Sequence, residues 1–470
     1  MRVDMNQKIK NAIPLPIYSE ARRVLLHLSK IFQNVYRAVV SDEYCRIYIN
    51  WNMPPRRWDN MTKIHWCYTR IEWRHRKLYA LLSCIAWPLK TCIFAWKRTR
   101  QYGPKVKEKT GIAMGRQVLD QIYFAIRHFI PPRAYYFYNL YEAANHDIAS
   151  LYVHEHEIVS LMRFLNATHQ VRILDDKRSF FRECTRLGFQ TIPIVAEFED
   201  GKLKTYIDSA NNILPKTDLF AKPALGKCGK GIESYGYDRE TDRYCCNDGT
   251  LITRDQLLRR LSQCSKRSPY IIQERIFNHP EISELFSEAL CTIRVVTGRA
   301  PSGPAEPLVS TFKMPTNNCI NDNFAAGGIA VAVEKTTGVL GKGITRDIAA
   351  ERVSRHPDTG HTFSGFRIPY WHQIIQLCLR IHDAFPDFSF VGWDVAVTKD
   401  GPVLVEANPD WGVEGIQRAH YVPLGMSRFA ELFILHIKQQ DRFNSILDPN
   451  FWTPDYVTIE SHSLHQDVLR

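Results

Sequence analysis

The stretch that most constrains the fold of this chain is Phe390 to Gly412, which reads FVGWDVAVTKDGPVLVEANPDWG. Two alternating apolar runs flank Lys399-Asp400-Gly401, a pattern typical of a β-hairpin with a tight turn. The alternating apolar residues are Val391, Trp393, Val395 and Val397 on the first strand and Val403 and Val405 on the second. The sequence therefore predicts a hairpin with one apolar and one polar face.

The polar face of this hairpin carries two acidic residues and an amide. With a three-residue turn, Asp394 faces Glu406 across the strands and Asn408 points to the same side. Like charges directly opposite each other destabilise a sheet, so a cation between them is one explanation and a solvated outer face is the other. Carboxylate and amide oxygens suit Mg²⁺ that carries phosphates. These three residues are candidate metal ligands.

Length and charge suggest several domains with different partners. A chain of 470 residues exceeds one ordinary core. Residues 1–110 hold 22 of the 61 Lys and Arg but 7 of the 49 Asp and Glu, a balance of +15 against +12 for the whole chain. Such a basic part can meet an anionic membrane face, an anionic polymer or nucleic acid, or be a solvated surface. The twelve Cys form no CxxC pair, which disfavours a zinc site and fits a reducing compartment.

The basic N-terminal part is also rich in tryptophan. Residues 1–110 contain six of the ten Trp, interleaved with Arg and Lys, but no RNA-binding or zinc-finger motif. Residues 78–96 are the most apolar window and contain Pro88 and Lys90. We expect a buried helix broken at Pro88, with a membrane-surface helix or a short membrane span as alternatives. The sequence predicts further helices over 111–165.

From about residue 170 the pattern changes to alternating strands and helices. Val171–Leu174 and Ile192–Val195 are predicted strands, and a helix is predicted from Asp175 to Leu187, closed by Gly188. This texture indicates an α+β or α/β body. The tail after about residue 444 is polar and carries no motif.

Further stretches of the α+β or α/β body combine predicted strands with charged residues or with a glycine-rich loop. FAKPALGKCGKGI (220–232) brings in Lys222 on a strand and follows it with a glycine-rich loop that suits phosphate oxygens, although an ordinary hairpin is the alternative. Tyr270–Ile276 is predicted to be a short buried strand whose later part carries polar groups, including Gln273 and Glu274. Arg294 lies in the middle of a predicted strand, where a charge needs a phosphate or a carboxylate partner, and Lys313 is placed similarly.

These stretches occur in an order that resembles the ATP-grasp superfamily. The motifs are DDKRSFFRECTRLGFQTIP, KPALGKCGKG, YIIQERI, TIRVV, NFAAGG and GWDVAVTKDGPVLVEAN, and they cover roughly Asp175 to Gly425. The chain is most similar to the sugar-transfer-associated, α-L-glutamate-ligase-related branch. The resemblance implies an ATP-grasp fold, two α+β subdomains that hold ATP, over residues 166–440. A mostly helical, basic, Trp-rich region (1–165) precedes it and a tail (441–470) follows it.

The resemblance also implies roles for individual residues. The nucleotide-binding residues it implies are Lys177, Lys222, Gly226, Gly229, Lys230, Gly231, Gln273, Glu274 and Arg294. The catalytic residues it implies are Arg294, Lys313 and Asn323, and the metal ligands are Asp394, Glu406 and Asn408. ATP and two Mg²⁺ ions, with Mn²⁺ as an alternative, are the expected cofactors. In ribosomal-protein-type glutamate ligases an Arg stands two residues before the Asn of the Asn-x-x-x-Gly-Gly loop. Asn321 stands there in this chain, so a different acid substrate is expected.

The leading hypothesis is an ATP-dependent carboxylate–amine ligase that forms an amide through an acyl phosphate, in exopolysaccharide or cell-envelope synthesis. The sugar connection rests on the resemblance alone. A kinase acting on a hydroxyl group and a non-catalytic ATP-binding regulator are the alternatives. We expect a cytoplasmic protein with no specific nucleic-acid partner, and with carboxylate and amine substrates that are free or linked to a sugar or carrier. Contact of the basic N-terminal region with the inner face of the membrane is an open alternative.

Overall fold

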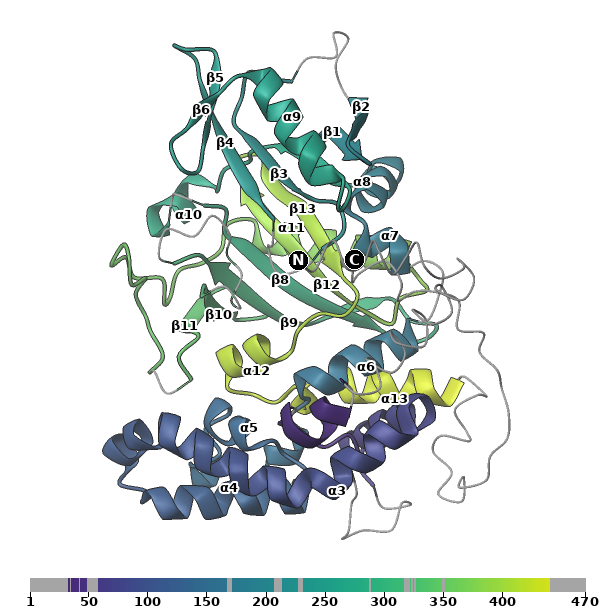
Figure 1. Cartoon of the computed structure of the whole chain (residues 1–470), viewed down its shortest axis with the longest axis vertical. Coiled ribbons are helices and arrows are strands. Elements are labelled where there is room, and N and C mark those ends of the chain that lie inside the picture. Colours follow the sequence, from purple (N-terminus) through teal and green to yellow (C-terminus); the bar gives the residue numbers. More distant parts are fainter. Residues whose placement is uncertain are drawn as a thin grey trace, which may run out of the picture. The chain divides into compact units, whose positions relative to one another are not determined.

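Figure 1 shows the computed structural model of the chain. The structure describes residues 33, 35–41, 43–48, 58–166, 171–206, 214–226, 231–286, 289–316, 322, 324, 327–348 and 351–439. The chain divides into two compact units, Met1–Arg57 with His65–Ser150, and Trp58–Ile64 with Leu151–Arg470. The predicted boundaries at 165 and 440 stay predictions, and the tail 441–470 lies outside the described residues.

The first unit is helical, as the sequence predicts. Its elements are a π-helical turn at Arg37–Ser41, most of helix α3 (Asn60–Thr110), α4 (Met114–His128), α5 (Pro132–Phe137) and the 3₁₀ turn Ala143–Asn145. Helix α4 is held against α3 by two buried amides. Gln117 Nε2 donates to the carbonyl of Gly103 at 3.2 Å, and Gln121 Nε2 donates to Thr99 Oγ1 at 2.7 Å. The contact between these two helices is therefore partly polar.

The prediction of a helix broken at Pro88 is wrong. Helix α3 continues through Pro88 and Pro104, and its non-helical backbone lies at Arg76. A proline inside a helix removes one hydrogen bond and crowds the carbonyl four residues earlier. Here the turns beside Pro88 are anchored, because Trp87 Nε1 donates to the carbonyl of Ala125 and Lys90 Nζ donates to that of Ala38, each at 2.9 Å.

The helices of the second unit frame its sheets. They are α6 (Glu155–Leu165), α7 (Val171–Asp175), α8 (Lys177–Arg186), α9 (Arg254–Ser265), α10 (Pro280–Leu285), α11 (Trp371–Ala384), α12 (Glu414–His420) and α13 (Phe429–Gln439), with 3₁₀ turns at Ala149–Leu151 and Leu424–Met426. Helix α8 begins at Lys177, two residues after the predicted Asp175, and Asp176 caps it by accepting from Arg178 N at 2.9 Å. Gly188 follows its end with φ +75°. The predicted strand at Val171–Leu174 is wrong, because these residues form α7; a four-residue apolar run is too short to distinguish the two.

Among the described residues, the strands of the second unit form two antiparallel sheets. The first has the order β2 (Lys202–Tyr206), β1 (Ile194–Glu199), β7 (Tyr270–Glu274), β3 (Leu219–Pro223), β4 (Glu233–Asp238), β5 (Arg243–Cys246), β6 (Leu251–Ile252). The second has the order β11 (Leu340–Ile344), β10 (Ile329–Val333), β9 (Ala305–Met314), β8 (Thr292–Arg299), β12 (Phe390–Thr398), β13 (Gly401–Asn408). The fold is α+β, which confirms the predicted class.

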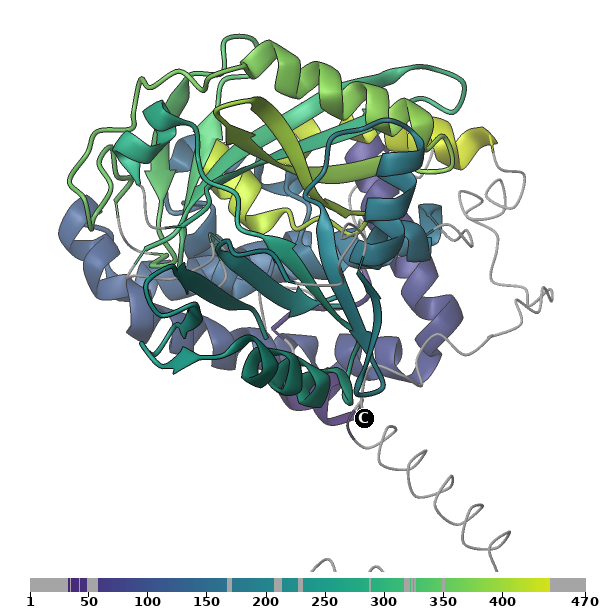
Figure 2. The same ribbon diagram turned by 90° about the horizontal axis from the view of Figure 1, so that it is seen from above.

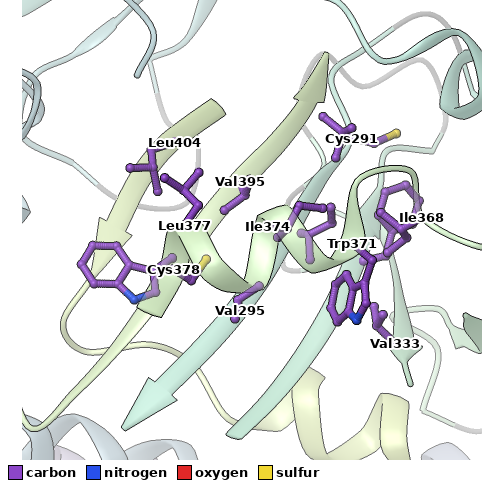
Figure 3. Packing of buried hydrophobic residues seen from close by; sticks show 14 of the residues in the cluster. Cys291, Val295, Val333, Ile368, Trp371, Ile374, Leu377, Cys378, Val395 and Leu404 are labelled. Atoms are coloured by element: carbon purple, nitrogen blue, oxygen red, sulfur yellow. The ribbon is translucent and has the colours of Figure 1, made fainter. Parts of the chain in front are cut away.

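One helix packs on the outer face of each sheet (Figure 2). Leu257 and Leu261 of α9 lie in a core with strands β1, β3 and β7. Ile374, Leu377 and Cys378 of α11 lie over β8, β12 and β13 (Figure 3). The candidate site is found on the opposite faces of the two sheets.

The hairpin β12–β13 has the predicted register at its polar residues and a different turn. Asp394 pairs with Glu406, but Thr398 pairs with Gly401, so the loop contains only Lys399 and Asp400. A bulge between Asp394 and Val395 absorbs the extra residue. The predicted position of Val403 and Val405 on the apolar face is consequently wrong. Leu404 and Ala407 lie in the core under α11 instead.

Candidate functional site

Strand alternation places a set of charged residues on the face of the second sheet opposite α11. Ile293, Val295 and Phe312 point into the core, so Arg294 and Lys313 point the other way. Arg294 of β8 pairs in register with Asp394 of β12. Three neighbouring strands, β9, β8 and β12, therefore each contribute one charged side chain to the same face.

Asp394 joins these charges. Arg294 grips it bidentately, with Nε to Oδ1 at 2.6 Å and Nη2 to Oδ2 at 2.7 Å, and Lys313 Nζ donates to Oδ2 at 3.0 Å. The Asp394 residue is 3% exposed. Burial alone would raise the pKa of its carboxyl, but the charges of Arg294 and Lys313 outweigh burial and hold that pKa well below its usual range. Arg294 thus has the carboxylate partner that its position in a strand required.

A second carboxylate lies on the other side of Lys313. Asp322 Oδ1 is 3.9 Å from Lys313 Nζ, and Asp322 Oδ2 accepts from Thr292 N at 2.8 Å and from the Thr292 hydroxyl. Burial raises the pKa of Asp322, while Lys313 opposes that rise. Sequence reasoning gave Asp322 no role. Its proximity to Lys313 depends on the course of a loop rather than on any local pattern.

Glu406 and Asn408 of β13 lie beside this group, closer to solvent. Glu406 Oε2 is 4.0 Å from Lys177 Nζ, at the start of α8, and the Glu406 side chain is 32% exposed. Asn408 Nδ2 donates to Glu406 Oε1 at 3.4 Å. Lys177 also donates from Nζ to the carbonyl of Gly226 at 3.0 Å. The predicted metal ligands and one predicted phosphate lysine therefore do come together.

Lys222 is the contribution of the first sheet to the group formed by Lys177 and Glu406. It lies on β3 with its side chain on the face opposite α9, and it is buried. Burial, together with the charge of Lys177, lowers the pKa of Lys222 to about 8, while Glu406 opposes both effects. Mutual repulsion of Lys177 and Lys222 is the effect expected where two ammonium groups are set to receive one anion.

The glycine-rich loop is described only at its two ends. Gly226 has φ +146° and its carbonyl accepts from Lys177. Gly231 has φ +76°, its carbonyl accepts from Tyr270 Oη at 2.9 Å, and a Cβ there would lie 2.7 Å from that oxygen. Gly229 and Lys230 lie outside the described residues, as do Asn321 and Asn323 of the predicted Asn-x-x-x-Gly-Gly loop. Their predicted roles stay predictions.

Gln273 has an unsatisfied oxygen at the end of β7. The residue is 5% exposed, and its Nε2 donates to the carbonyl of Ile192 at 2.8 Å. Its Oε1 is buried with no hydrogen-bond partner in the described structure. A buried acceptor without a donor is costly unless a ligand supplies one. Glu274, the next residue, is exposed at the strand end and by alternation points to the opposite face.

Sequence reasoning missed Glu155, the first residue of α6. Its Oε2 accepts from the backbone N–H groups of Val413 at 3.0 Å and Glu414 at 3.4 Å, just after β13. Burial and the charge of Glu414 raise the pKa of Glu155, while Arg294 opposes that rise. An acidic residue in the first turn of a helix is ordinarily explained by the helix dipole, so nothing local marked it as part of the site.

Comparison with protein families identifies this arrangement. Residues 157–424, more than half of the chain, match the profile described as "Sugar-transfer associated ATP-grasp". The chain belongs to this ATP-grasp family. The predicted family and its expected α+β fold are thereby confirmed. No curated protein matches the sequence.

The solved structures that match this chain include two enzymes at low identity. An ADP complex of N5-carboxyaminoimidazole ribonucleotide synthetase is 11% identical, with a TM-score of 0.32, 53% of this chain and 51% of that chain covered. D-alanine–D-alanine ligase from Bacillus anthracis, complexed with ATP, is 12% identical, with a TM-score of 0.33, 57% of this chain and 69% of that chain covered. This chain thus spans about half the length of the first of them, and such distant similarity does not bear on its activity.

The residues of this ATP-grasp site fit a magnesium ion that arrives with phosphate. Asp394, Glu406 and Asn408 offer hard oxygen atoms, the donors that Mg²⁺ prefers. Both oxygens of Asp394 accept from Arg294 or Lys313, so the ion would share this carboxylate with them. The site's charged side chains are four cations, Lys177, Lys222, Arg294 and Lys313, and four carboxylates, Glu155, Asp322, Asp394 and Glu406. The cations suit the oxygens of a polyphosphate, and the carboxylates suit the metal ion that accompanies it.

Proposed function

We propose that this ATP-grasp protein is an ATP-dependent carboxylate–amine ligase. The observation that carries the proposal is the meeting of Lys177 and Lys222 with Glu406, next to Asp394 held between Arg294 and Lys313. The lysine and arginine side chains there suit phosphate oxygens, and the carboxylates of Asp394 and Glu406 suit Mg²⁺. No activated Ser, Cys or His is needed for the proposed chemistry.

The reaction proceeds in two balanced steps. A carboxylate oxygen of the acid attacks the γ-phosphorus, the bond from that phosphorus to the β-phosphate oxygen breaks, and ADP leaves with that electron pair. The product is an acyl phosphate. The amine nitrogen then attacks the acyl carbon, the carbon–oxygen bond to phosphate breaks, and inorganic phosphate leaves. The nitrogen loses one proton and an amide remains.

The residues of the chain position and stabilise rather than react. Lys177 and Lys222 bind the phosphates, and Arg294 and Lys313 offset the charge that develops on the transferred phosphoryl group. Asp394, Glu406 and Asn408 would hold Mg²⁺, whose positive charge would offset that of the phosphates. Gln273 Oε1 would accept from the exocyclic amine of adenine, which provides its missing donor. Asn323 and the Gly226–Gly231 loop would close over the reacting groups.

The family's description supports a cellular setting. A sugar-transfer associated ATP-grasp protein suits exopolysaccharide or cell-envelope polysaccharide synthesis, on the cytoplasmic side where ATP is present. The acid or amine would then be attached to a sugar or to a carrier. This assignment rests on family analogy and not on the geometry of the site.

The test of this proposal measures ADP release. The protein is incubated with Mg²⁺-ATP, with and without pooled amino acids and sugar acids, and with hydroxylamine added to trap an acyl phosphate as a hydroxamate. We expect an acid pool to stimulate ADP release and to yield the hydroxamate. Release that requires a hydroxyl acceptor and gives no hydroxamate would contradict the ligase and indicate a kinase. If the protein binds ATP but no pool stimulates its conversion to ADP, the result would contradict an enzyme that acts on free acids and would favour a regulator.

The pH dependence of ATP use should follow Lys222. Its lowered pKa of about 8 means that its positive charge is lost as the pH rises through 8. We expect kcat/KM for ATP to fall about tenfold for each pH unit above about 8, since kcat/KM reports the ionisation of the free enzyme. Lys222→Arg keeps its charge throughout this range, so its profile should stay flat.

Folding stability provides the control for this profile. Between pH 8 and 10.5 the unfolded chain binds more protons at Lys222 than the folded chain does, so this group makes stability rise with pH. Loss of ATP use with rising pH would therefore not reflect unfolding at this residue. A wild-type profile without the decline, or the same decline in Lys222→Arg, would contradict the role of Lys222.

A further inference from the structure

The exposed face of helix α3 between residues 78 and 96 is entirely apolar. The large side chains on it are Leu78, Leu81, Ile85, Leu89, Ile93 and Trp96, with exposures of 59%, 44%, 68%, 68%, 55% and 61%. The other exposed residues of this stretch are Pro88 and Cys92. At 100° per residue, these positions form an arc of about 140° around the helix. We call this arc the α3 apolar face.

The buried side of the same stretch contains apolar residues such as Trp87 and Phe94, but it also contains polar ones. Ser83, Lys90 and Thr91 are at most 2% exposed. Lys90 Nζ donates to the carbonyl of Ala38, and Ser83 Oγ accepts from Arg46 N at 3.0 Å. These contacts lie within the first unit. The polar side chains of this stretch thus point toward its own unit, while the apolar side chains of the α3 apolar face point outward.

Helix α4 of the same unit also exposes large apolar side chains and buries polar ones. Leu119, Tyr123 and Ile126 are 64%, 57% and 44% exposed. Gln117 and Gln121 are completely buried, and the hydroxyl of Tyr136 donates to Gln117 Oε1 at 2.9 Å. Scattered apolar residues are normal on a protein surface, but large exposed apolar side chains on two helices of one unit indicate a surface that another apolar phase covers.

Basic residues border the α3 apolar face at both of its ends. Arg76 and Lys77 precede it, Lys97 and Arg100 follow it, and all four are exposed. Between these pairs no exposed charge occurs. An apolar band flanked by cations, with a Trp at its edge, complements a phospholipid surface with anionic headgroups.

We propose that the first unit docks on the surface of an anionic phospholipid membrane through the α3 apolar face. This inference is independent of the proposed ligase chemistry. Helix α3 is long and apolar enough to cross a membrane by length and composition, with 44% of its most apolar window buried. It docks rather than spans, because Lys90 and Ser83 hold its other side against residues of the same unit. Two copies of the chain would instead bring the same basic borders together, which like charges oppose.

The test measures binding to sedimented vesicles of phosphatidylcholine with and without phosphatidylglycerol. We expect the full chain to bind the phosphatidylglycerol vesicles, and salt or omission of that lipid to weaken binding. Leu89→Glu places a charge in the middle of the α3 apolar face and should reduce partitioning by about tenfold or more. Gln101→Glu is the matched control, since it adds the same charge to an exposed position of α3 outside this face and should change partitioning less than about twofold.

Parallel readouts decide between the remaining outcomes. Circular dichroism should show both variants folded, because Leu89 is 68% exposed and leaves no cavity. Failure of the wild type to bind phosphatidylglycerol vesicles, or equal binding by Leu89→Glu, would overturn the proposal. Sedimentation velocity that reveals a dimer dispersed by Leu89→Glu, without vesicle binding, would overturn it in favour of a second copy. ADP release by Leu89→Glu without vesicles should match the wild type.

Discussion

Asp394→Asn should lower the free energy of unfolding by about 3–5 kcal/mol, the usual effect of breaking a buried ion pair from one side. The substitution leaves the side-chain shape almost unchanged but removes the charge that balances Arg294 and Lys313. Their side chains are 17% and 14% exposed, so water replaces the lost carboxylate poorly. The total free energy of unfolding of a typical domain is about 5–15 kcal/mol, so this loss would bring the second unit close to instability.

Urea denaturation measures this effect, with the midpoint expected to fall at an unchanged m-value. Asp400→Asn, in the exposed turn of the same hairpin, is the matched control and should stay within about 0.5 kcal/mol of the wild type. The pKa of Asp394 is lowered by folding, so its contribution is complete above the unfolded pKa of about 4 and is lost as the pH falls below it. An Asp394→Asn protein as stable as the wild type at pH 7 would contradict this account.

The hairpin shows how far the sequence determines a local structure. Alternation predicted the strands and placed Asp394 opposite Glu406, and the structure confirms that pairing. The turn and the apolar face of the second strand were wrong, because a bulge displaces Leu404 by one position. Leu404 N donates to the carbonyl of Gln190 at 3.1 Å, a contact more than 200 residues away in sequence. Such a bulge depends on a partner that no local pattern reveals.

Helix α3 shows the limit of the rule that apolar residues are buried. Its apolar composition predicted a buried helix, yet Ser83 and Lys90 point inward and Leu89 points outward. Composition alone does not predict which face of a helix is buried when both faces contain apolar residues. The direction follows from the carbonyl of Ala38 and the backbone of Arg46, which offer partners only on one side.

The sequence analysis assigned a separate role to each motif of the candidate site. Arg294 was assigned to phosphate and Asp394 to metal, but in the structure each is the other's partner. The strand positions and the charges were predictable, because alternation fixes which face they share. The pairing of Arg294 with Asp394 was not predictable, because it depends on the order of β8, β9 and β12 within the sheet. Glu155 was missed for the same reason, since only the folded chain brings α6 to the end of β13.

Glu406→Ala should abolish ATP turnover and leave the fold intact. Glu406 is 32% exposed and its oxygen lies 4.0 Å from Lys177 Nζ, a partly solvated ion pair worth at most about 1 kcal/mol. Its proposed role as a magnesium ligand is different, because it acts on the charge that develops during phosphoryl transfer. We expect ADP release at saturating acceptor to fall by about 10²- to 10³-fold. Glu284→Ala, an exposed carboxylate in α10 of the same unit, is the control and should retain full turnover.

A second readout separates this role of Glu406 from a merely structural one. Glu406 raises the pKa of Lys222 against burial and the charge of Lys177, so its removal should move that pKa below about 8. ATP binding by folded Glu406→Ala should therefore weaken at lower pH than binding by the wild type, which a titration at several pH values measures. If circular dichroism shows Glu406→Ala unfolded, the residue is structural. If the folded variant turns over ATP normally, the proposed site is wrong, because the one carboxylate in it that is open to solvent would then have no part in the reaction.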